Sequence, residues 1–310
     1  MILVAGSANL DFVVRAHHIP TPGETVLGQT FTTYPGGKGA NQAVACARAG
    51  QATTHMLLCV GDDHFAAPLL DSLSAAGVRL YRVPSQQQPT GCAFICVADS
   101  AENAITVAPG ANLCLQAEHL PILTGFSHLL MQLEIPLATV MAYAQSAHAQ
   151  GVRVVLNAAP AEALPIELLA SVDVLIVNEG ELAALVPYPV SLITNLAQVA
   201  VPCVVVTLGA RGCVARLGNN FFVQPAFPVD AVDTTGAGDT FCGVLTAALS
   251  RGDTITEAMR QASAAGALAC TLAGAQSSIP SASAVAAFLA SQPEPSEDAI
   301  DVLRGYCGLG

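Results

Sequence analysis

The residues best suited to chemistry lie in one stretch, residues 233–241, which reads Asp-Thr-Thr-Gly-Ala-Gly-Asp-Thr-Phe. Its small residues, Gly236, Ala237 and Gly238, stand where a loop is expected to enter a helix, because an apolar run follows. The first N–H groups of a helix are unpaired and carry the positive end of the helix dipole, which suits an anion such as phosphate. Asp239 would repel that anion, so it is either a proton acceptor beside a phosphate or a simple helix cap.

A second stretch combines glycines with one basic residue. Residues 35–41 read Pro-Gly-Gly-Lys-Gly-Ala-Asn and precede a predicted helix over residues 42–49. Lys38 is the only lysine among 310 residues. Glycines allow a backbone to approach a ligand closely. We therefore expect Lys38 to bind a ligand, and the alternative is a solvated lysine at the start of a helix.

The chain alternates short apolar runs with helical segments such as residues 137–150. Such runs are typical of parallel strands covered on both faces, and the carboxyl ends of these strands line one crevice. The predicted strands of this series are residues 2–6, 128–133, 152–157, 172–177 and 203–208. The polar residues at or beyond their ends are Asn9, Asp11, Gln132, Glu134, Asn157, Asn178, Glu181 and Thr207.

Two pairs among these polar residues have informative spacing. Asn9 and Asp11 are two apart, so they point the same way in an extended chain and could grip neighbouring hydroxyls, unless they form an Asx turn. Asn178 and Glu181 are three apart at a predicted helix start and share one face. They could hold a water shell around Mg²⁺, which favours oxygen ligands, or they could cap the helix. We expect this pair to meet Glu134 and Thr207 in one crevice.

Other segments differ in pattern from the main series. Residues 12–34 and 90–108 alternate and carry Thr and aromatic residues, which indicates a β insert without helices. Alanine-rich helical runs cover residues 254–273 and 282–290. Residues 291–310 contain two prolines and acidic residues, and they are expected to form a loosely attached tail.

Composition excludes several classes of partner. The chain is 53% hydrophobic, with a net charge of −12 and 11 Lys and Arg in total. This balance argues against nucleic acid and against an anionic membrane surface. The start of the chain does not read as a signal peptide, and no apolar run reaches the roughly 18 residues of a membrane span. The ten cysteines lie in apolar contexts, which predicts a reducing, cytoplasmic location.

Three separated motifs together resemble the signatures of the ribokinase-like (PfkB) carbohydrate kinases, in that family's order. They are Gly-Gly-Lys-Gly-Ala-Asn at 36–41, Asn-x-x-Glu at 178–181 and the stretch at 233–241. The resemblance implies a Rossmann-like three-layer α/β/α domain over residues 1–290, with a small β-sheet lid inserted at about 11–35 and 89–109. Lids of this kind often pair subunits, so a homodimer through the lid is expected.

The resemblance also implies transfer of the γ-phosphate of ATP to the hydroxymethyl oxygen of a neutral sugar. The acceptor would be D-ribose and the product ribose 5-phosphate. Deoxyribose, fructose or another hexose, and a nucleoside remain open as alternatives, as does a non-catalytic sugar-binding protein on this fold. The intact Asp239, Gly236 and Gly238 speak against the last of these. A nucleoside would need an aromatic platform, for which the candidates are Phe12, Phe31, Tyr34 and Phe94.

By match of motif, the resemblance gives each site residue a role. Asp239 would be the base, and Gly236, Ala237 and Gly238 the anion hole. The sugar would be bound by Asn9, Asp11, Gly37, Lys38, Asn41, Glu134 and Asp239. ATP would be bound by Asn178, Thr207, Gly209, Gly212, Gly238 and Ser263. Mg²⁺ would be ordered through water by Asn178 and Glu181. K⁺ would be bound near Asp233, Thr235, Ala269, Gly274 and Ser278. Leu272 departs from the family, which often has a basic residue there.

Overall fold

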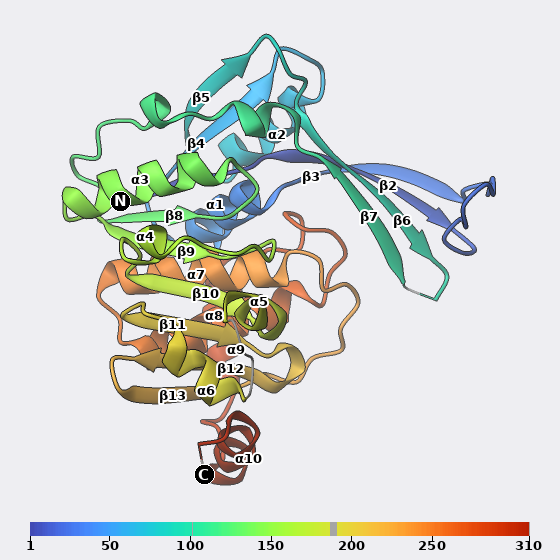
Figure 1. The fold of residues 1–310 in the computed structure, drawn as a ribbon. Coiled ribbons are helices and arrows are strands. Elements are labelled where there is room, and N and C mark those ends of the chain that lie inside the picture. The colour runs from blue at the N-terminus through green and yellow to red at the C-terminus, as the bar shows by residue number, and fades with distance from the viewer. Residues whose placement is uncertain (101, 187–190, 310) are drawn as a thin grey trace.

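The computed structural model describes residues 1–100, 102–186 and 191–309, and its centre is a nine-stranded sheet (Figure 1). In sheet order, the strands are β13 (Asn220–Pro225), β12 (Gly212–Leu217), β11 (Cys203–Thr207), β10 (Val174–Asn178), β9 (Arg153–Asn157), β8 (His128–Met131), β1 (Ile2–Ala5), β4 (Thr54–Gly61) and β5 (Arg79–Ser85). In this order, the strands from β11 to β5 are parallel, whereas β12 and β13 form an antiparallel extension at one edge.

Helices cover both faces of this sheet, which confirms the predicted three-layer architecture. Alternate strand residues belong to two separate buried clusters, one on each face. The first face is covered by α1 (Lys38–Arg48), α2 (Ala66–Ala75), α7 (Ala237–Arg251), α8 (Ile255–Ala269) and α9 (Ala282–Ser291). The second carries α3 (Leu137–Ala149), α4 (Ile166–Leu169), α5 (Glu179–Leu185), α6 (Leu192–Gln198) and α10 (Glu297–Cys307). Short 3₁₀ turns are η1 (Gly110–Cys114), η2 (Ala117–His119) and η3 (Gly209–Arg211).

The predicted β insert is a separate sheet that projects from the main body (Figure 1). Its strands are β3 (Thr30–Gly36), β2 (Asn9–Ala16), β6 (Gly91–Ala98) and β7 (Asn103–Ala108), in that order. Phe12 stacks between Phe31 and Phe94, with ring centroids 6.1 and 5.3 Å away. These three phenylalanines of the lid therefore pack on one another. In the described part of the chain, no helix is long and apolar enough to cross a lipid bilayer.

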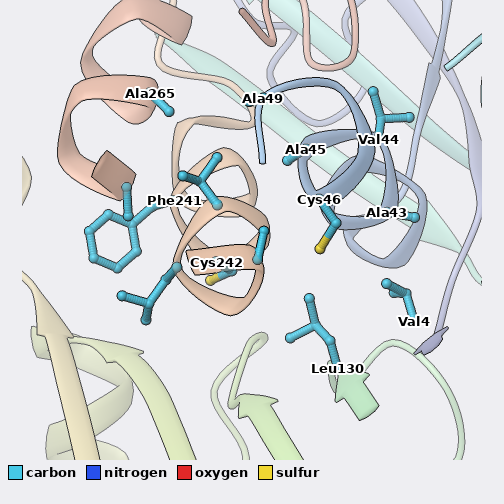
Figure 2. Close-up of a cluster of buried hydrophobic side chains, with 14 of the residues drawn as sticks. Val4, Ala43, Val44, Ala45, Cys46, Ala49, Leu130, Phe241, Cys242 and Ala265 are labelled. Carbon is cyan, nitrogen blue, oxygen red and sulfur yellow. The ribbon is translucent and has the colours of Figure 1, made fainter. Parts of the chain in front are cut away.

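Small residues bring α1 and α7 unusually close, and this contact positions the site. A Cβ atom added to Gly243 would lie 2.6 Å from both the Cβ of Ala45 and the carbonyl oxygen of Gln42. The thiol of Cys46 donates to the carbonyl of Gly243 at 3.2 Å. Figure 2 shows Cys46 on α1 and Cys242 on α7 in the same buried cluster. This tight packing holds the start of α1 against the start of α7.

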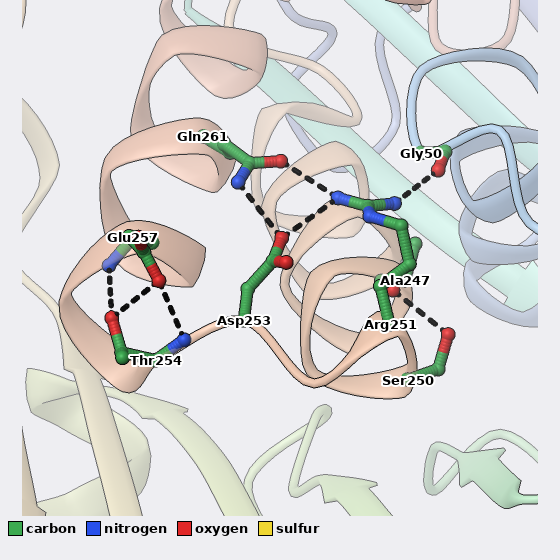
Figure 3. Close-up of polar contacts among 8 residues, drawn as sticks. All are labelled: Gly50, Ala247, Ser250, Arg251, Asp253, Thr254, Glu257 and Gln261. Atoms are coloured by element: carbon green, nitrogen blue, oxygen red, sulfur yellow. Dashed lines mark hydrogen bonds and ion pairs between the residues drawn. The ribbon is translucent and has the colours of Figure 1, made fainter.

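The far end of α7 is fixed by a polar network (Figure 3). Arg251 donates to the carbonyl of Gly50 at 2.6 Å, to Asp253 at 3.1 Å and to Gln261 at 2.7 Å. Thr254 caps α8 through a reciprocal capping box with Glu257. These contacts tie α7 to α8 and to the turn that follows α1, so the helix cannot slide along its axis without breaking them.

The expectation of a loosely attached tail after residue 290 is wrong. Residues 297–307 form α10, which packs against β13 and buries Leu303 and Cys307. The signals were present in the sequence, because Ser296 is an N-cap, acidic residues fill the first turn, and Gly308 ends the helix with φ +83°. The neighbouring prolines and charges masked this pattern. Gly310 lies outside the described residues.

Removing the buried side chain of α10 should cost stability. Leu303→Ala is expected to lower the free energy of unfolding by about 2–4 kcal/mol, because it deletes apolar contacts and leaves a cavity. Val302→Ala is the matched control, since Val302 is 74% exposed on the same helix. Urea unfolding followed by circular dichroism measures both. Equal stabilities for the two variants would mean that α10 does not dock in solution.

Candidate active site

Asp239 lies in the first turn of α7, and its carboxylate points toward α1. The side chain is buried. Asn41 donates from Nδ2 to Oδ2 of Asp239 at 2.9 Å, and Gln42 donates from Nε2 to Oδ1 at 3.0 Å. Both donors are neutral amides, so they fix the orientation of the carboxylate without adding a compensating charge. The alternative of a simple cap is wrong, because Gly236 is the N-cap residue and makes no side-chain cap.

Buried side-chain amides form a hydrogen-bonded chain that supports this carboxylate, and the sequence analysis did not predict this chain. Gln132 donates to Oε1 of Gln42 at 2.6 Å, and the Nε2 of Gln42 also donates to Asn157 at 3.0 Å. Asn157 in turn donates to the carbonyl of Ile176 at 3.1 Å. Gln132 and Asn157 follow buried strands, so their place at the strand ends was the available signal. Their function as supports for a helix residue could not be read from it.

The start of α7 presents free backbone donors. Gly236 has φ +75°, a conformation that favours glycine, and turns the chain into the helix. The N–H of Ala237 already donates to the carbonyl of Thr234 at 3.2 Å. Within the described part of the chain, the N–H groups of Gly238 and Asp239 make no hydrogen bond. Gly238 is exposed, so these two donors are the ones that an anion could reach.

An open cavity of about 240 Å³ lies in front of these donors. It gathers predicted residues from five separate segments of the chain, at the carboxyl ends of the strands as expected. Among its lining residues are Lys38, Asn157, Asn178, Glu181, Thr207, Gly236, Gly238 and Asp239. Glu134 is not part of this lining, so the expectation that it meets Asn178, Glu181 and Thr207 in one crevice is only partly met.

Lys38 is the positive charge of this cavity. The charge of Asp239 raises the pKa of the Lys38 ammonium, burial opposes this, and the charges of Glu134 and Glu181 raise the pKa further. Lys38 is therefore a cation at neutral pH. It lies in the same cavity as Asn178 and Thr207, which were predicted to bind the nucleotide. This position favours a role toward the phosphate as well as toward the sugar.

Asn178 and Glu181 form a reciprocal capping box at the start of α5. Glu181 N donates to the Oδ1 of Asn178, and Asn178 N donates to Oε2 of Glu181, both at 2.8 Å. The capping interpretation is thus correct for these atoms. The Oε1 of Glu181 accepts no bond within the described residues, which leaves an oxygen available to a water molecule around Mg²⁺. Burial and the charge of Asp239 raise the pKa of Glu181, and they outweigh the Asn178 N–H and the charge of Lys38, which lower it.

Three predicted sugar-binding residues, Asn9, Asp11 and Glu134, lie outside the lining of this cavity, and Asn9 and Asp11 belong to lid strand β2. Burial, then the charges of Glu134 and Asp239, raises the pKa of Asp11 to about 7. Within the described residues, no group donates a hydrogen bond to Asp11. Asn9 accepts from Asn112 at 2.7 Å. Glu134 accepts from the Ser7 hydroxyl at 2.5 Å and from the Lys38 N–H at 3.1 Å.

The glycines of residues 36–39 serve chain packing. A Cβ on Gly37, where φ is +88°, would lie 2.7 Å from the N of Asn9. A Cβ on Gly39 would lie 2.6 Å from the N of Ser7. These positions therefore let the start of α1 press against the bend after β1, which places Asn41 beside Asp239. Gln42, Ser7 and Asn112 complete the arrangement although the sequence gave them no role.

Three of the residues predicted to bind ATP, Gly209, Gly212 and Ser263, lie outside the lining of the cavity. Gly209 has φ +57° and open space around its Cα. Gly212 is required for packing, because a Cβ there would lie 2.0 Å from the carbonyl oxygen of Gln224. The hydroxyl of Ser263 lies 3.6 Å from the sulfur of Cys213. These residues sit next to the strand end that carries Thr207, along the same edge of the sheet.

The predicted K⁺ residues come from two loops that Asp233 joins. Its Oδ1 accepts from the N–H and the hydroxyl of Thr235 at 2.9 and 2.6 Å, and its Oδ2 accepts from Gly274 N at 2.9 Å. Burial alone would raise the pKa of Asp233, but these hydrogen bonds outweigh it and lower the pKa. Ala269 and Ser278 lie at either end of the second loop and are buried. Among the described residues, no three His, Cys, Asp or Glu side chains gather as metal ligands.

Comparison with known proteins identifies the family. Residues 1–282 match the family described as pfkB family carbohydrate kinase. The chain belongs to the pfkB family of carbohydrate kinases. It is 40% identical over 303 residues to a ribokinase of Haemophilus influenzae, covering 93% of this chain and 98% of that protein.

Solved structures of pfkB family members share this fold. The ribokinase of Thermotoga maritima matches with a TM-score of 0.86 and 36% identity, over 94% of this chain and 99% of that one. The ribokinase of Arabidopsis thaliana, solved with ribose and ATP, matches with a TM-score of 0.86 and 32% identity, over the same shares. The predicted family and its α/β fold with a small β lid are therefore confirmed.

In this pfkB kinase, the raised pKa of Asp11 predicts a dependence of stability on pH. The pKa is raised to about 7 in the folded chain from its ordinary value of 3.8, so the folded state holds this proton more tightly. The stability that the protonated group contributes is complete below pH 3.8 and is lost as the pH rises to about 7. At pH 8, Asp11→Asn should therefore have a free energy of unfolding higher than that of the native protein by on the order of 4 kcal/mol, and it should unfold at a higher temperature. Near pH 4 the two proteins should unfold at the same temperature.

Asp63 provides a control, because its pKa is shifted in the opposite direction to that of Asp11. Burial alone would raise the pKa of Asp63, but hydrogen bonds from Thr90, Phe65 and Ala66 lower it. Asp63→Asn should therefore destabilise the protein at pH 8. Calorimetry at pH 4, 6 and 8 separates the two cases. A lower unfolding temperature for Asp11→Asn at pH 8 would show that the Asp11 carboxylate stabilises the fold.

Proposed function

We propose that this pfkB kinase transfers the γ-phosphoryl group of ATP to the hydroxymethyl oxygen of D-ribose, giving ribose 5-phosphate. The observation that carries the proposal is the position of Asp239. Its carboxylate is held by Asn41 and Gln42 at the start of a helix whose free N–H groups face a cavity that contains Lys38. Relatives that are named ribokinases, one of them solved with ribose and ATP, support ribose as the acceptor.

In the proposed reaction, Asp239 accepts the proton of the hydroxymethyl group. The oxygen forms a bond to the γ-phosphorus as the bond from that phosphorus to the bridging oxygen of ADP breaks. The N–H groups of Gly238 and Asp239, at the start of α7, and the ammonium of Lys38 stabilise the negative charge on the transferring group. Ala237 serves this anion hole by shaping the turn, because its own N–H is already bonded to Thr234.

On the sugar side, we assign the ribose hydroxyls to Asn9, Asp11, Asn41 and Glu134, beside the backbone of Gly37. Asp11 supports this assignment, because its buried carboxylate has no internal donor within the described residues and a hydroxyl would supply one. On the nucleotide side, ATP would lie along Asn178, Thr207, Gly209, Gly212 and Ser263. Asn178 and Thr207 end neighbouring strands and pair in the sheet register. Gly209 and Gly212 follow Thr207 in the chain, and Ser263 lies on α8 beside Cys213.

Two ions are part of the proposal. Mg²⁺ fits beside Asn178 and Glu181 through water, because one oxygen of Glu181 remains free of the capping box. When bound, it would neutralise charge on the phosphate oxygens. K⁺ would lie between the loops that Asp233 joins, near Thr235, Ala269, Gly274 and Ser278. Asp233 would support this cation through the loops, and backbone carbonyls would be its ligands.

A homodimer through the lid is also proposed. The lid exposes large apolar side chains, with Phe31 62%, Phe94 53% and Ile105 55% exposed. Exposed apolar groups of this kind are typical of contact surfaces. Light scattering on the purified protein should give twice the chain mass. The mass of a single chain at micromolar concentration would contradict the dimer.

The test of function is an ATP-consumption screen over ribose, deoxyribose, fructose, other hexoses and nucleosides, each with K⁺ and with Na⁺. We expect the highest kcat/KM for ribose and a higher rate with K⁺. A higher kcat/KM for another sugar would reassign the substrate and leave the kinase chemistry in place. Absence of ATP consumption with every acceptor would contradict the kinase itself.

A further inference from the structure

Helix α10 lies beyond the part of the chain that matches the family, which ends at residue 282. Its buried residues, Leu303 and Cys307, belong to the same hydrophobic cluster as Val206 and Leu208, on either side of the strand end at Thr207. Leu182 of α5 is also a member. The helix therefore lies on the same face of the sheet as α5, where it packs against β13.

One exposed side chain of α10 bridges these two segments. The hydroxyl of Tyr306 donates to Oε1 of Glu179 at 2.6 Å. The guanidinium carbon of Arg211 lies 4.3 Å from the centre of the Tyr306 ring, in cation–π geometry. Glu179 stands between the capping residues Asn178 and Glu181, and Arg211 belongs to the η3 turn between Gly209 and Gly212. Tyr306 thus contacts both segments, and it is not among the residues that line the cavity.

We propose that Tyr306 is a positioning residue for the nucleotide: it holds the start of α5 and the η3 turn in the arrangement that ATP requires. This inference rests on the proposed function. Gly209 and Gly212 make the η3 turn adaptable unless other contacts fix it, because glycine is conformationally permissive. A turn that is fixed before binding loses less conformational freedom when the ligand arrives, which strengthens binding. The residues assigned to the sugar include neither Glu179 nor Arg211 nor any residue of α10, so sugar binding should not respond.

The test compares Tyr306→Ala with Tyr306→Phe, and Val302→Ala is the control on the same helix. Tyr306→Ala should raise the KM for ATP, and the Kd for ADP measured by calorimetry, by roughly three- to tenfold, with the KM for ribose unchanged within twofold. Tyr306→Phe keeps the ring over Arg211 and loses only the bond to Glu179, so it should raise them by a smaller factor. Val302→Ala should change none of these values.

A double-mutant cycle tests the contact itself. If Tyr306 acts through Arg211, then adding Arg211→Ala to Tyr306→Ala should raise the KM for ATP by less than the product of the two single effects. Unchanged ATP and ADP affinity in Tyr306→Ala would overturn the inference, as would equal weakening of ATP and ribose, which is what general loosening of the fold predicts. If the inference on Tyr306 fails while the native protein still phosphorylates ribose, the proposed function stands. If the native protein binds no ATP, both the inference and the proposed function fail.

Discussion

Replacing Asp239 with asparagine is expected to lower kcat by about 10³-fold, while the KM values for ribose and ATP change by less than about threefold. Asparagine keeps the shape of the side chain, and its oxygen can still accept from Asn41 or Gln42. It cannot take a proton from the sugar hydroxyl. Because the lost interaction forms only as the proton moves, the effect should appear in kcat rather than in binding. Steady-state kinetics with a coupled ADP assay measures this.

Asp253→Asn is the matched control for this substitution. Asp253 follows the far end of the same helix and accepts from Arg251 and Gln261, so it tests whether loss of any carboxylate near α7 is enough (Figure 3). We expect it to keep kcat within a factor of about two. A kcat near the native value in Asp239→Asn would remove Asp239 as the base.

Lys38→Met should be the second most damaging change, with kcat about 100-fold lower. The substitution keeps an unbranched apolar stem and removes the one ammonium in the cavity. The charge of Asp239 is the largest influence that raises the pKa of Lys38, and Glu134 and Glu181 act in the same direction. Without the cation, these carboxylates would repel an incoming phosphate. The KM for ATP should therefore rise more than the KM for ribose.

Lys38→Arg keeps the charge and distinguishes electrostatics from contact. It should recover part of the kcat lost in Lys38→Met, although a guanidinium cannot reproduce the position of an ammonium. If Lys38→Met instead weakens ribose alone and leaves the kcat and the KM for ATP near native values, then Lys38 is purely a sugar ligand, as the sequence resemblance suggested.

Much of the fold was predictable because it depends on local patterns. Short apolar runs identified the parallel strands, and an alternating Thr-rich and aromatic pattern identified the lid. The strand ends predicted which polar residues share an edge, and Asn178 and Thr207 do lie on neighbouring strands. The prediction of a loose tail was wrong for a local reason too. Charges and prolines around residue 295 obscured the pattern of a capped amphipathic helix.

The site was harder to predict, because its geometry depends on contacts between distant helices. Nothing in the sequence near Gln42 shows that its amide reaches Asp239, a contact that Gly243 makes possible by letting α1 and α7 approach. Likewise, the glycines before Lys38 were read as space for a ligand, whereas Gly37 and Gly39 make room for the backbone at Ser7 and Asn9. Such requirements exist only in the assembled fold.

The central claim is that the chain phosphorylates the hydroxymethyl oxygen of ribose. Proton-coupled ³¹P NMR of the reaction of ribose with ATP tests it most directly, because a phosphate on a CH₂–O group is split into a triplet by two protons. The account predicts one phosphomonoester triplet, formed together with ADP, and no product from 5-deoxyribose. A doublet would place the phosphate on a ring carbon, and that result, or inorganic phosphate as the only product, would contradict the account.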